Sequence, residues 1–226
     1  MRNLTIILLL LSSIFFSACN EQGGPKEGEL IYKITYLQSE RENPLVALLP
    51  KTVSMRFKDD NTAIYVEGFF GTFQLKFITN RKEKVSYTVL RIMDKKYISV
   101  NHIDSLNAGY EDFSNMQITK NPNDTISFAG LLCYQARVLC AQMSDTAVSV
   151  YYTYDIDIEE PNSNSPYSQI DGVLAKFQTR VAGIDMVFEL VEFNNIQIDD
   201  SEFIFPTDYE EITNQELNEI LESFQE

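Results

Sequence analysis

Residues 30–36 read LIYKITY and residues 184–190 read IDMVFEL, and these two stretches decide the fold. Every second residue of each stretch is apolar: Leu30, Tyr32, Ile34 and Tyr36 in the first, and Ile184, Met186, Phe188 and Leu190 in the second. Side chains two positions apart lie on the same face of an extended chain. Each stretch therefore predicts a β-strand with one face in a protein core.

Similar rows occur between these two stretches. Alternate positions are apolar in two further segments: Phe73, Leu75 and Phe77 in one, and Ile126, Phe128, Leu132, Tyr134, Ala136 and Val138 in the other. Turn-forming residues separate the rows, for example at residues 59–61, 80–82 and 182–183. Short strands separated by turns are typical of an antiparallel meander. We therefore predict a mainly β fold.

The C-terminal residues follow a different period. Thr213 and Glu216 have the spacing of a capping box, in which each side chain bonds the backbone of the other residue. An apolar stripe with helical spacing follows: Leu217, Ile220, Leu221 and Phe224. We predict a helix over residues 213–225 that packs this stripe against the sheet or across an open end of it. The alternative is a helix that binds a partner protein.

The N-terminal residues have the organisation of an export signal. Arg2 precedes an unbroken apolar run over residues 6–11, and the small residues Ser17 and Ala18 precede Cys19. The apolar run is shorter than the about 20 residues that a membrane span requires. Residues 1–18 therefore predict a signal peptide. One interpretation is an ordinary secretory signal in which the cysteine is incidental.

The other interpretation is a lipoprotein signal, because Phe16-Ser17-Ala18-Cys19 resembles a lipobox, the recognition site of the lipoprotein signal peptidase. The resemblance implies that Cys19 is lipidated, and two or three acyl chains would make a stable anchor. Residues 19–29 are rich in glycine and predict a flexible tether. By resemblance to lipoprotein sorting rules, Asn20 implies the outer membrane, and the single nearby acid Glu21 favours the periplasmic face.

Composition narrows the possible partners. The formal net charge is −15, from 33 acidic and 18 basic residues. This balance argues against a nucleic-acid partner, whose phosphates bind Lys and Arg, and against a surface that lies flat on anionic lipid. Residues 30–226 are enough to form one sizeable core, so we predict a single β-rich domain.

Two cysteines remain besides Cys19. Cys133 and Cys140 are seven positions apart, an odd number, so one continuous strand would place them on opposite faces. A disulfide requires Cα atoms within about 7 Å of each other. We therefore predict that these two cysteines lie in one strand and do not pair with each other.

The sequence contains no recognisable catalytic or metal-binding pattern. The single histidine, His102, lies near Asp104 and Ser105, but no nucleophile-elbow glycine pattern accompanies them. Asp155 and Asp157 could suggest calcium, yet the EF-hand spacing is missing, and a solvated acidic strand edge is the simpler interpretation. We therefore predict that the protein is not an enzyme and takes no cofactor and no metal.

Three segments resemble an uncharacterised family of envelope lipoproteins named for a Gly-Leu-Pro-Gly-Leu-Ile motif: residues 130–136 (GLLCYQA), 150–156 (VYYTYDI) and 170–174 (IDGVL). The segment Phe203-Ile204-Phe205-Pro206, followed by Tyr209, resembles the close of LolA/LolB-like half-barrels. Those proteins curl an antiparallel sheet around helices and hold acyl chains in the concave face. The second resemblance implies an antiparallel open or half β-barrel with a C-terminal α-helix.

The apolar rows and the resemblance lead to one functional hypothesis. We expect a periplasm-facing outer-membrane lipoprotein that binds an apolar or amphiphilic envelope ligand, a lipid or a lipoprotein acyl chain, in a concave sheet. The rows supply the expected ligand-binding residues: Phe73, Leu75, Phe77, Phe128, Leu132, Tyr134, Ile184, Met186, Phe188 and Leu190. The same rows could instead simply fill the core. The alternative function is a structural or accessory lipoprotein that binds another envelope protein and no small molecule.

Overall fold

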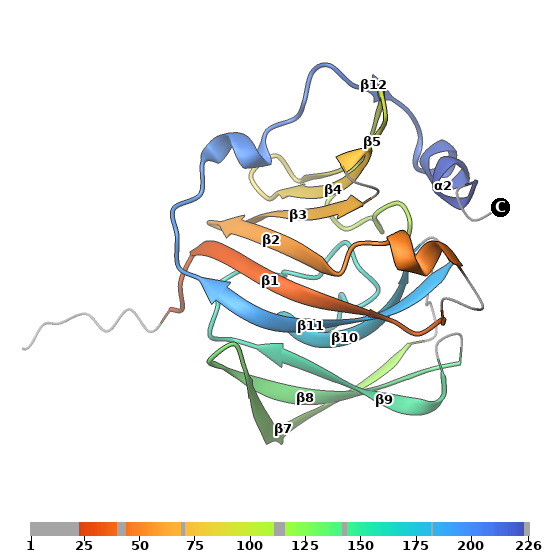
Figure 1. The fold of residues 1–226 in the computed structure, drawn as a ribbon. Coiled ribbons are helices and arrows are strands. Elements are labelled where there is room, and N and C mark those ends of the chain that lie inside the picture. Colours follow the sequence, from red (N-terminus) through yellow and green to blue (C-terminus); the bar gives the residue numbers. More distant parts are fainter. Residues whose placement is uncertain are drawn as a thin grey trace, which may run out of the picture.

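The computed structural model describes residues 23–39, 44–68, 71–110, 116–141, 144–181 and 183–223 (Figure 1). Cys19 and the predicted signal peptide lie outside these residues. The described strands form one sheet: β1 (Glu27–Tyr36), β2 (Thr52–Lys58), β3 (Asn61–Gly68), β4 (Phe73–Asn80), β5 (Val85–Ile92), β6 (Lys95–His102), β7 (Gln117–Phe128), β8 (Leu131–Cys140), β9 (Ser144–Thr153), β10 (Val173–Val181), β11 (Ile184–Asn194) and β12 (Glu210–Glu211). The described helices are η1 (Pro44–Leu48), η3 (Asp200–Phe203) and α2 (Asn214–Glu222).

Two antiparallel meanders make the sheet. Strands β1 to β6 pair in chain order, strands β7 to β11 do the same, and β1 pairs with β11 to join the two meanders. The two edges are β7 and the short β12, which lies parallel to β6. The sheet is curved and does not close on itself (Figure 1). The prediction of a mainly β, antiparallel open fold with a C-terminal helix is confirmed.

The joint between β1 and β11 is built from the alternating segments 30–36 and 184–190. Leu30, Tyr32 and Ile34 of β1 are buried, whereas Lys33 between them is exposed. Ile34 lies directly opposite Phe188 of β11 in the antiparallel register. The alternation therefore places the apolar side chains of both strands on the same face of the sheet.

The C-terminal helix begins as its capping box predicts. The Thr213 hydroxyl oxygen accepts a hydrogen bond from the Glu216 backbone N–H (3.2 Å), and the Thr213 backbone N–H donates to the Glu216 carboxylate (2.8 Å). Leu217 and Leu221 are buried beside Leu75 and Phe77 of β4, so the apolar stripe packs against the sheet. Phe224 lies outside the described residues. None of the helices in the described ranges is long and apolar enough to cross a membrane.

Both cysteines of the domain lie on β8, as predicted. Cys133 and Cys140 are buried and are not bonded to each other. The Cys133 thiol is within 3.6 Å of the Leu131 carbonyl oxygen, which it can reach as a weak donor. Burial raises the pKa of this thiol, which keeps it in the less reactive protonated form.

Candidate functional site

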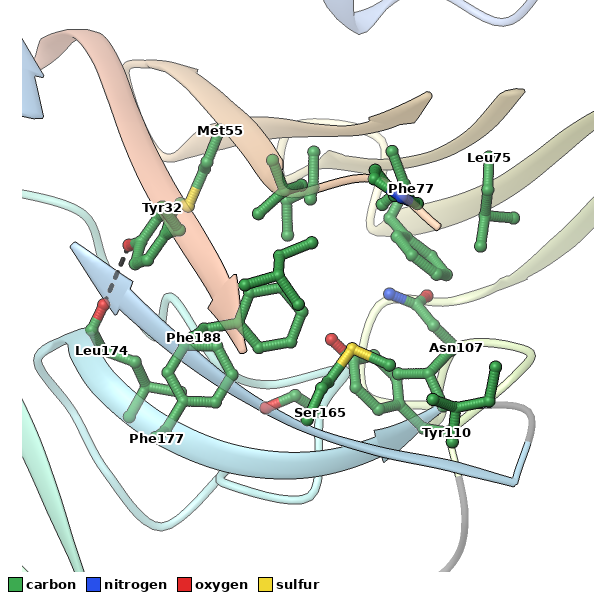
Figure 2. Close-up of a pocket in the computed structure, with 18 of the residues that line it drawn as sticks. Tyr32, Met55, Leu75, Phe77, Asn107, Tyr110, Ser165, Leu174, Phe177 and Phe188 are labelled. Carbon is green, nitrogen blue, oxygen red and sulfur yellow. Dashed lines mark hydrogen bonds between the residues drawn. The ribbon is translucent and has the colours of Figure 1, made fainter. Parts of the chain in front are cut away.

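A partly enclosed pocket lies between one face of the sheet and three segments that cover it (Figure 2). The wall comes from β1 to β4, β10 and β11, and the cover comes from the β6–β7 connection, the β9–β10 connection and α2. The pocket has a volume of about 190 Å³. An apolar cavity of about 150 Å³ is enough to hold benzene, whereas sites for drug-sized ligands begin at about 300 Å³. The pocket therefore suits a small apolar group or one end of a longer chain.

One end of the pocket is an aromatic cluster around Phe177 of β10. The Phe177 ring stacks on Phe188 of β11, directly opposite in the register, with centroids 5.0 Å apart and an angle of 13°. Tyr32 and Tyr167 meet the same ring edge-on, at 6.3 Å and 5.7 Å. The Tyr32 hydroxyl donates to the Leu174 carbonyl oxygen at 2.8 Å, so this polar group is satisfied within the wall (Figure 2).

The opposite end of the pocket is formed by β4 and the β6–β7 connection. Leu75 and Phe77 alternate along β4 and reach the pocket from the same face of the sheet. Phe77 stacks on Tyr110 with centroids 5.9 Å apart. Leu221 of α2 also lines the pocket, so the C-terminal helix closes part of it.

Six of the ten predicted binding residues line this pocket: Phe73, Leu75, Phe77, Ile184, Met186 and Phe188. They belong to the β4 and β11 rows, which the fold brings together through β1, β2 and β3. Leu190 continues the β11 row but is buried in the neighbouring core, only 2% exposed, and does not line the pocket. Strand alternation thus predicts six residues that line the pocket. Their role in binding a ligand stays a prediction.

The third predicted row, over residues 126–138, is wrong as a single row. Ala129 and Gly130 both have positive φ angles, 50° and 82°, and form a two-residue hairpin turn between β7 and β8. Across this turn Phe128 pairs with Leu131 and not with Leu132. Counting every second residue through the turn therefore joins positions on opposite faces: Leu131 shares the face of Phe128, whereas Ala136 and Val138 are buried in a separate core cluster on the other face.

The three residues predicted from this row lie outside the pocket. Leu132 is 45% exposed, whereas its neighbours Leu131 and Cys133 are buried. Phe128 is half-buried and contacts the Tyr151 ring at 5.5 Å between centroids. Tyr134 is also half-buried and packs against the core cluster at the β8–β9 end of the sheet. None of the three contributes to the pocket wall.

Residues 159–169 of the β9–β10 connection form part of the pocket cover. Asn164 is 8% exposed, and its Nδ2 donates to the Thr79 hydroxyl at 2.7 Å. Asn162 is 6% exposed, and its Nδ2 donates to the carbonyl oxygens of Ile170 (2.6 Å) and Gly172 (2.9 Å). Sequence reasoning missed this role because a segment of Pro, Asn and Ser has the composition of an exposed loop.

Asn107 contributes a buried polar side chain to the wall of the pocket. It is 4% exposed, and no described residue donates a hydrogen bond to its Oδ1. A buried polar atom left unsatisfied costs about 1–3 kcal/mol. The unsatisfied Oδ1 of Asn107 therefore destabilises the folded state unless a molecule that enters the pocket donates a hydrogen bond to it. Its burial could not be predicted from the sequence, because an isolated Asn in a connection belongs to no periodic pattern.

Tyr110 lies three residues after Asn107 in the same turn. Its backbone N–H donates a hydrogen bond to the Asn107 carbonyl oxygen at 3.3 Å. Burial raises the pKa of the Tyr110 hydroxyl to about 12, so it is protonated and can donate a hydrogen bond at neutral pH. No hydrogen bond from this hydroxyl to another described residue is present. Asn107 and Tyr110 together place one amide and one hydroxyl at the pocket.

The described residues that line the pocket include no Asp, Glu, Lys, Arg or His. The single histidine lies elsewhere: the His102 side chain is 61% exposed, and its Nδ1 is 3.3 Å from the Asp104 carboxylate. Within the described parts of the chain, no group of three or more His, Cys, Asp or Glu side chains is placed to hold a metal ion. The arrangement can bind an apolar group and hydrogen-bond a neutral one.

Comparisons with known proteins leave the family open. No family model matches the chain, and no curated protein matches it. Among solved structures, the chain is similar to a DUF1329 family protein from Desulfovibrio piger, with 11% identity over 80% of this chain and 90% of that one. The TM-score is 0.21, so this likeness carries no argument about fold or function.

Proposed function

We propose that this protein binds an apolar or amphiphilic ligand, a lipid or a lipoprotein acyl chain, in the pocket beneath the β9–β10 connection. The observation that carries the proposal is an uncharged apolar wall around a space of about 190 Å³. Apolar ligands are held by such walls with only a few polar groups to orient them.

The volume of the pocket sets the expected affinity. A chain segment of about six methylenes gains about 5 kcal/mol on leaving water, at about 0.8 kcal/mol for each methylene. Before the entropy cost of association is subtracted, that free energy corresponds to a dissociation constant on the order of 10⁻⁴ M, which is the tightest binding that this burial alone allows. Tighter binding needs further contacts of the ligand outside the pocket, so the first experiments call for a method suited to weak binding.

A pocket-filling substitution tests this function. Ile64 of β3 lines the pocket and packs against the core clusters on both sides of it. Ile64→Trp places a large ring in the space, whereas Leu132→Trp places the same ring on an exposed position outside it. Saturation-transfer difference NMR with toluene as the probe should show binding to the purified full chain and to Leu132→Trp. Ile64→Trp should weaken binding at least about tenfold.

The stability of Ile64→Trp distinguishes a ligand pocket from a core that merely packs imperfectly. In a ligand pocket the ring is accommodated, and the unfolding midpoint stays near that of the wild type. In a close-packed core the same ring costs about 1–3 kcal/mol. Native mass spectrometry of the wild type should also show a co-purified lipid. A wild-type chain without toluene signal and without lipid would refute the proposal.

The proposal includes the place of the protein in the cell. Cys19 is the lipidated residue, the membrane is the outer membrane, and the domain faces the periplasm. Support for this part comes from the sequence alone, from Phe16-Ser17-Ala18-Cys19 and from Asn20 directly after them. The predicted tether over residues 19–29 is wrong at its C-terminal end, because Glu27, Gly28 and Glu29 belong to β1 and pair with β2. The residues before β1 would still link the lipid to the domain and keep the domain near the membrane surface.

One observation favours the alternative, an accessory lipoprotein that binds another envelope protein. Leu132 and Tyr154 are 45% and 49% exposed on neighbouring parts of β8 and the β9 end, and Tyr154 contacts the Tyr134 ring at 5.7 Å. Exposed apolar groups of this kind occur in protein interfaces. A photo-crosslinker placed at Leu132 of the membrane-bound chain would capture one defined envelope protein in this case. A chain that binds toluene and captures no protein excludes the alternative.

A further inference from the structure

Asn107 is held in place by its backbone, which leaves its side chain for the pocket. The Asn107 backbone N–H donates to the Asn164 carbonyl oxygen at 3.1 Å in the β9–β10 connection. On either side, the Leu106 carbonyl oxygen accepts from Asn214 Nδ2 (3.2 Å), and the Gly109 N–H donates to Asn218 Oδ1 (2.7 Å). The β6–β7 connection is thus fixed both to the other covering segment and to α2.

The polar groups lie at one end of the pocket. Figure 2 shows Asn107 and Tyr110 together with Leu75 and Phe77, while Tyr32, Met55, Leu174, Phe177 and Phe188 lie at the other end. The other polar side chains of the wall already have partners inside the protein. Asn162 and Asn164 donate to the acceptors described above, and the Ser165 hydroxyl donates to the Asn162 carbonyl oxygen at 3.0 Å.

The uncharged wall of the pocket disfavours a charged ligand. A carboxylate or an ammonium group inside the pocket would lose its water without meeting an opposite charge, because the lining residues carry none. An uncharged polar group meets no such penalty, and Asn107 offers it both an N–H donor and a carbonyl acceptor. Tyr110 adds a hydroxyl donor next to the amide.

We infer that the pocket takes an uncharged amphiphile whose hydroxyl or amide group hydrogen-bonds Asn107 and Tyr110, while its apolar part lies against Phe177 and Phe188. This inference rests on the proposed ligand-binding function and names the class of ligand. It also supplies the partner that the buried Asn107 Oδ1 lacks among the described residues.

A series of eight-carbon compounds tests the inference. Octan-1-ol and octanamide are neutral, whereas octanoate and octylammonium are charged at pH 7, and each is titrated into the purified full chain by the same NMR experiment. The neutral compounds should bind at least about tenfold more tightly than the charged ones. Asn107→Leu should weaken octanamide binding about fivefold relative to its effect on toluene binding. Asn195→Leu makes the same change on an exposed connection and should leave both unchanged.

Two further variants keep the test decisive if Asn107→Leu fails to fold. Tyr110→Phe retains the ring that stacks on Phe77 and removes only the hydroxyl, so the variant should weaken octan-1-ol binding more than it changes toluene binding. Asn107→Asp keeps the shape of the side chain and adds a negative charge, so octylammonium should bind more tightly than to the wild type.

The outcomes separate the inference from the function on which it rests. A wild-type chain that binds neither toluene nor octan-1-ol overturns the proposed function. A chain that binds toluene, but binds octanoate as tightly as octan-1-ol, overturns the inference alone. Unchanged binding of octanamide to Asn107→Leu, or of octan-1-ol to Tyr110→Phe, overturns it in the same way.

Discussion

The proposed membrane anchor depends on a single thiol, that of Cys19. Acylation requires this sulfur, so Cys19→Ser should move the protein from the membrane fraction to the soluble fraction and abolish incorporation of radiolabelled palmitate. Cys140→Ser removes a thiol that is buried in β8 and should leave the protein in the membrane pellet. Palmitate that still enters Cys19→Ser, or a Cys19→Ser chain that still sediments with membranes, contradicts the anchor.

The individual residues of the pocket differ in whether the sequence predicts them. Phe73, Phe77 and Phe188 follow from alternation, because an apolar residue at every second position must face one side of a strand. Asn107 and Asn164 could not be found in this way, because they lie in connections and are buried only by contacts between segments far apart in the chain. Their burial is a property of the assembled fold and leaves no local pattern.

At the scale of elements, the β7–β8 hairpin contains a strained residue. Ala129 has a φ of 50°, in a left-handed region that costs most L-residues about 1–2 kcal/mol. Asn-Gly is the preferred pair for a two-residue hairpin of this kind, and Gly130 already follows. Ala129→Asn should therefore raise the free energy of unfolding by about 0.5–1 kcal/mol in urea denaturation. Gly130→Ala, at a φ of 82°, should lower it. The opposite order of the two variants would show that the turn is not as described.

The elements differ in how far the sequence predicts them. β1, β4, β11 and α2 could be predicted, since each carries a period or a capping box of its own. η1, η3 and the two-residue β12 could not, because such short segments have no period to read. The pairing of β1 with β11 also has no local signal, since it joins residues about 150 positions apart. The error at Leu132 arose at the junction of two elements, where one turn reversed the parity.

For the whole molecule, buried tyrosines predict a loss of stability in alkali. Burial raises the pKa of Tyr87, Tyr110 and Tyr152 to about 12, and it raises those of Tyr32 and Tyr167 further. An unfolded tyrosine ionises near pH 10, so between pH about 10 and 12 the unfolded chain has lost protons that the folded chain retains. The stabilisation is thus complete below pH about 10 and declines as the pH rises.

Urea unfolding at pH 8, 10 and 11, with tyrosinate absorbance recorded in parallel, measures this effect. The urea concentration at the unfolding midpoint should be lower at pH 11 than at pH 10. The tyrosinate absorbance should rise together with unfolding. Tyrosines that all ionise near pH 10 while the chain stays folded would show that these side chains are not buried as described.

The two edge strands of the sheet affect how readily copies of the protein aggregate. β12 offers only two residues, and β7 is mostly exposed, carries Lys120, Pro122 and Asp124, and shifts its register between Asn121 and Thr125. Short, charged and irregular edges with proline are poor templates for another strand. Copies that the proposed anchor holds side by side on a membrane would meet at high local concentration, where an open sheet is most prone to pair with its neighbours. These edges let the sheet remain open and still resist aggregation.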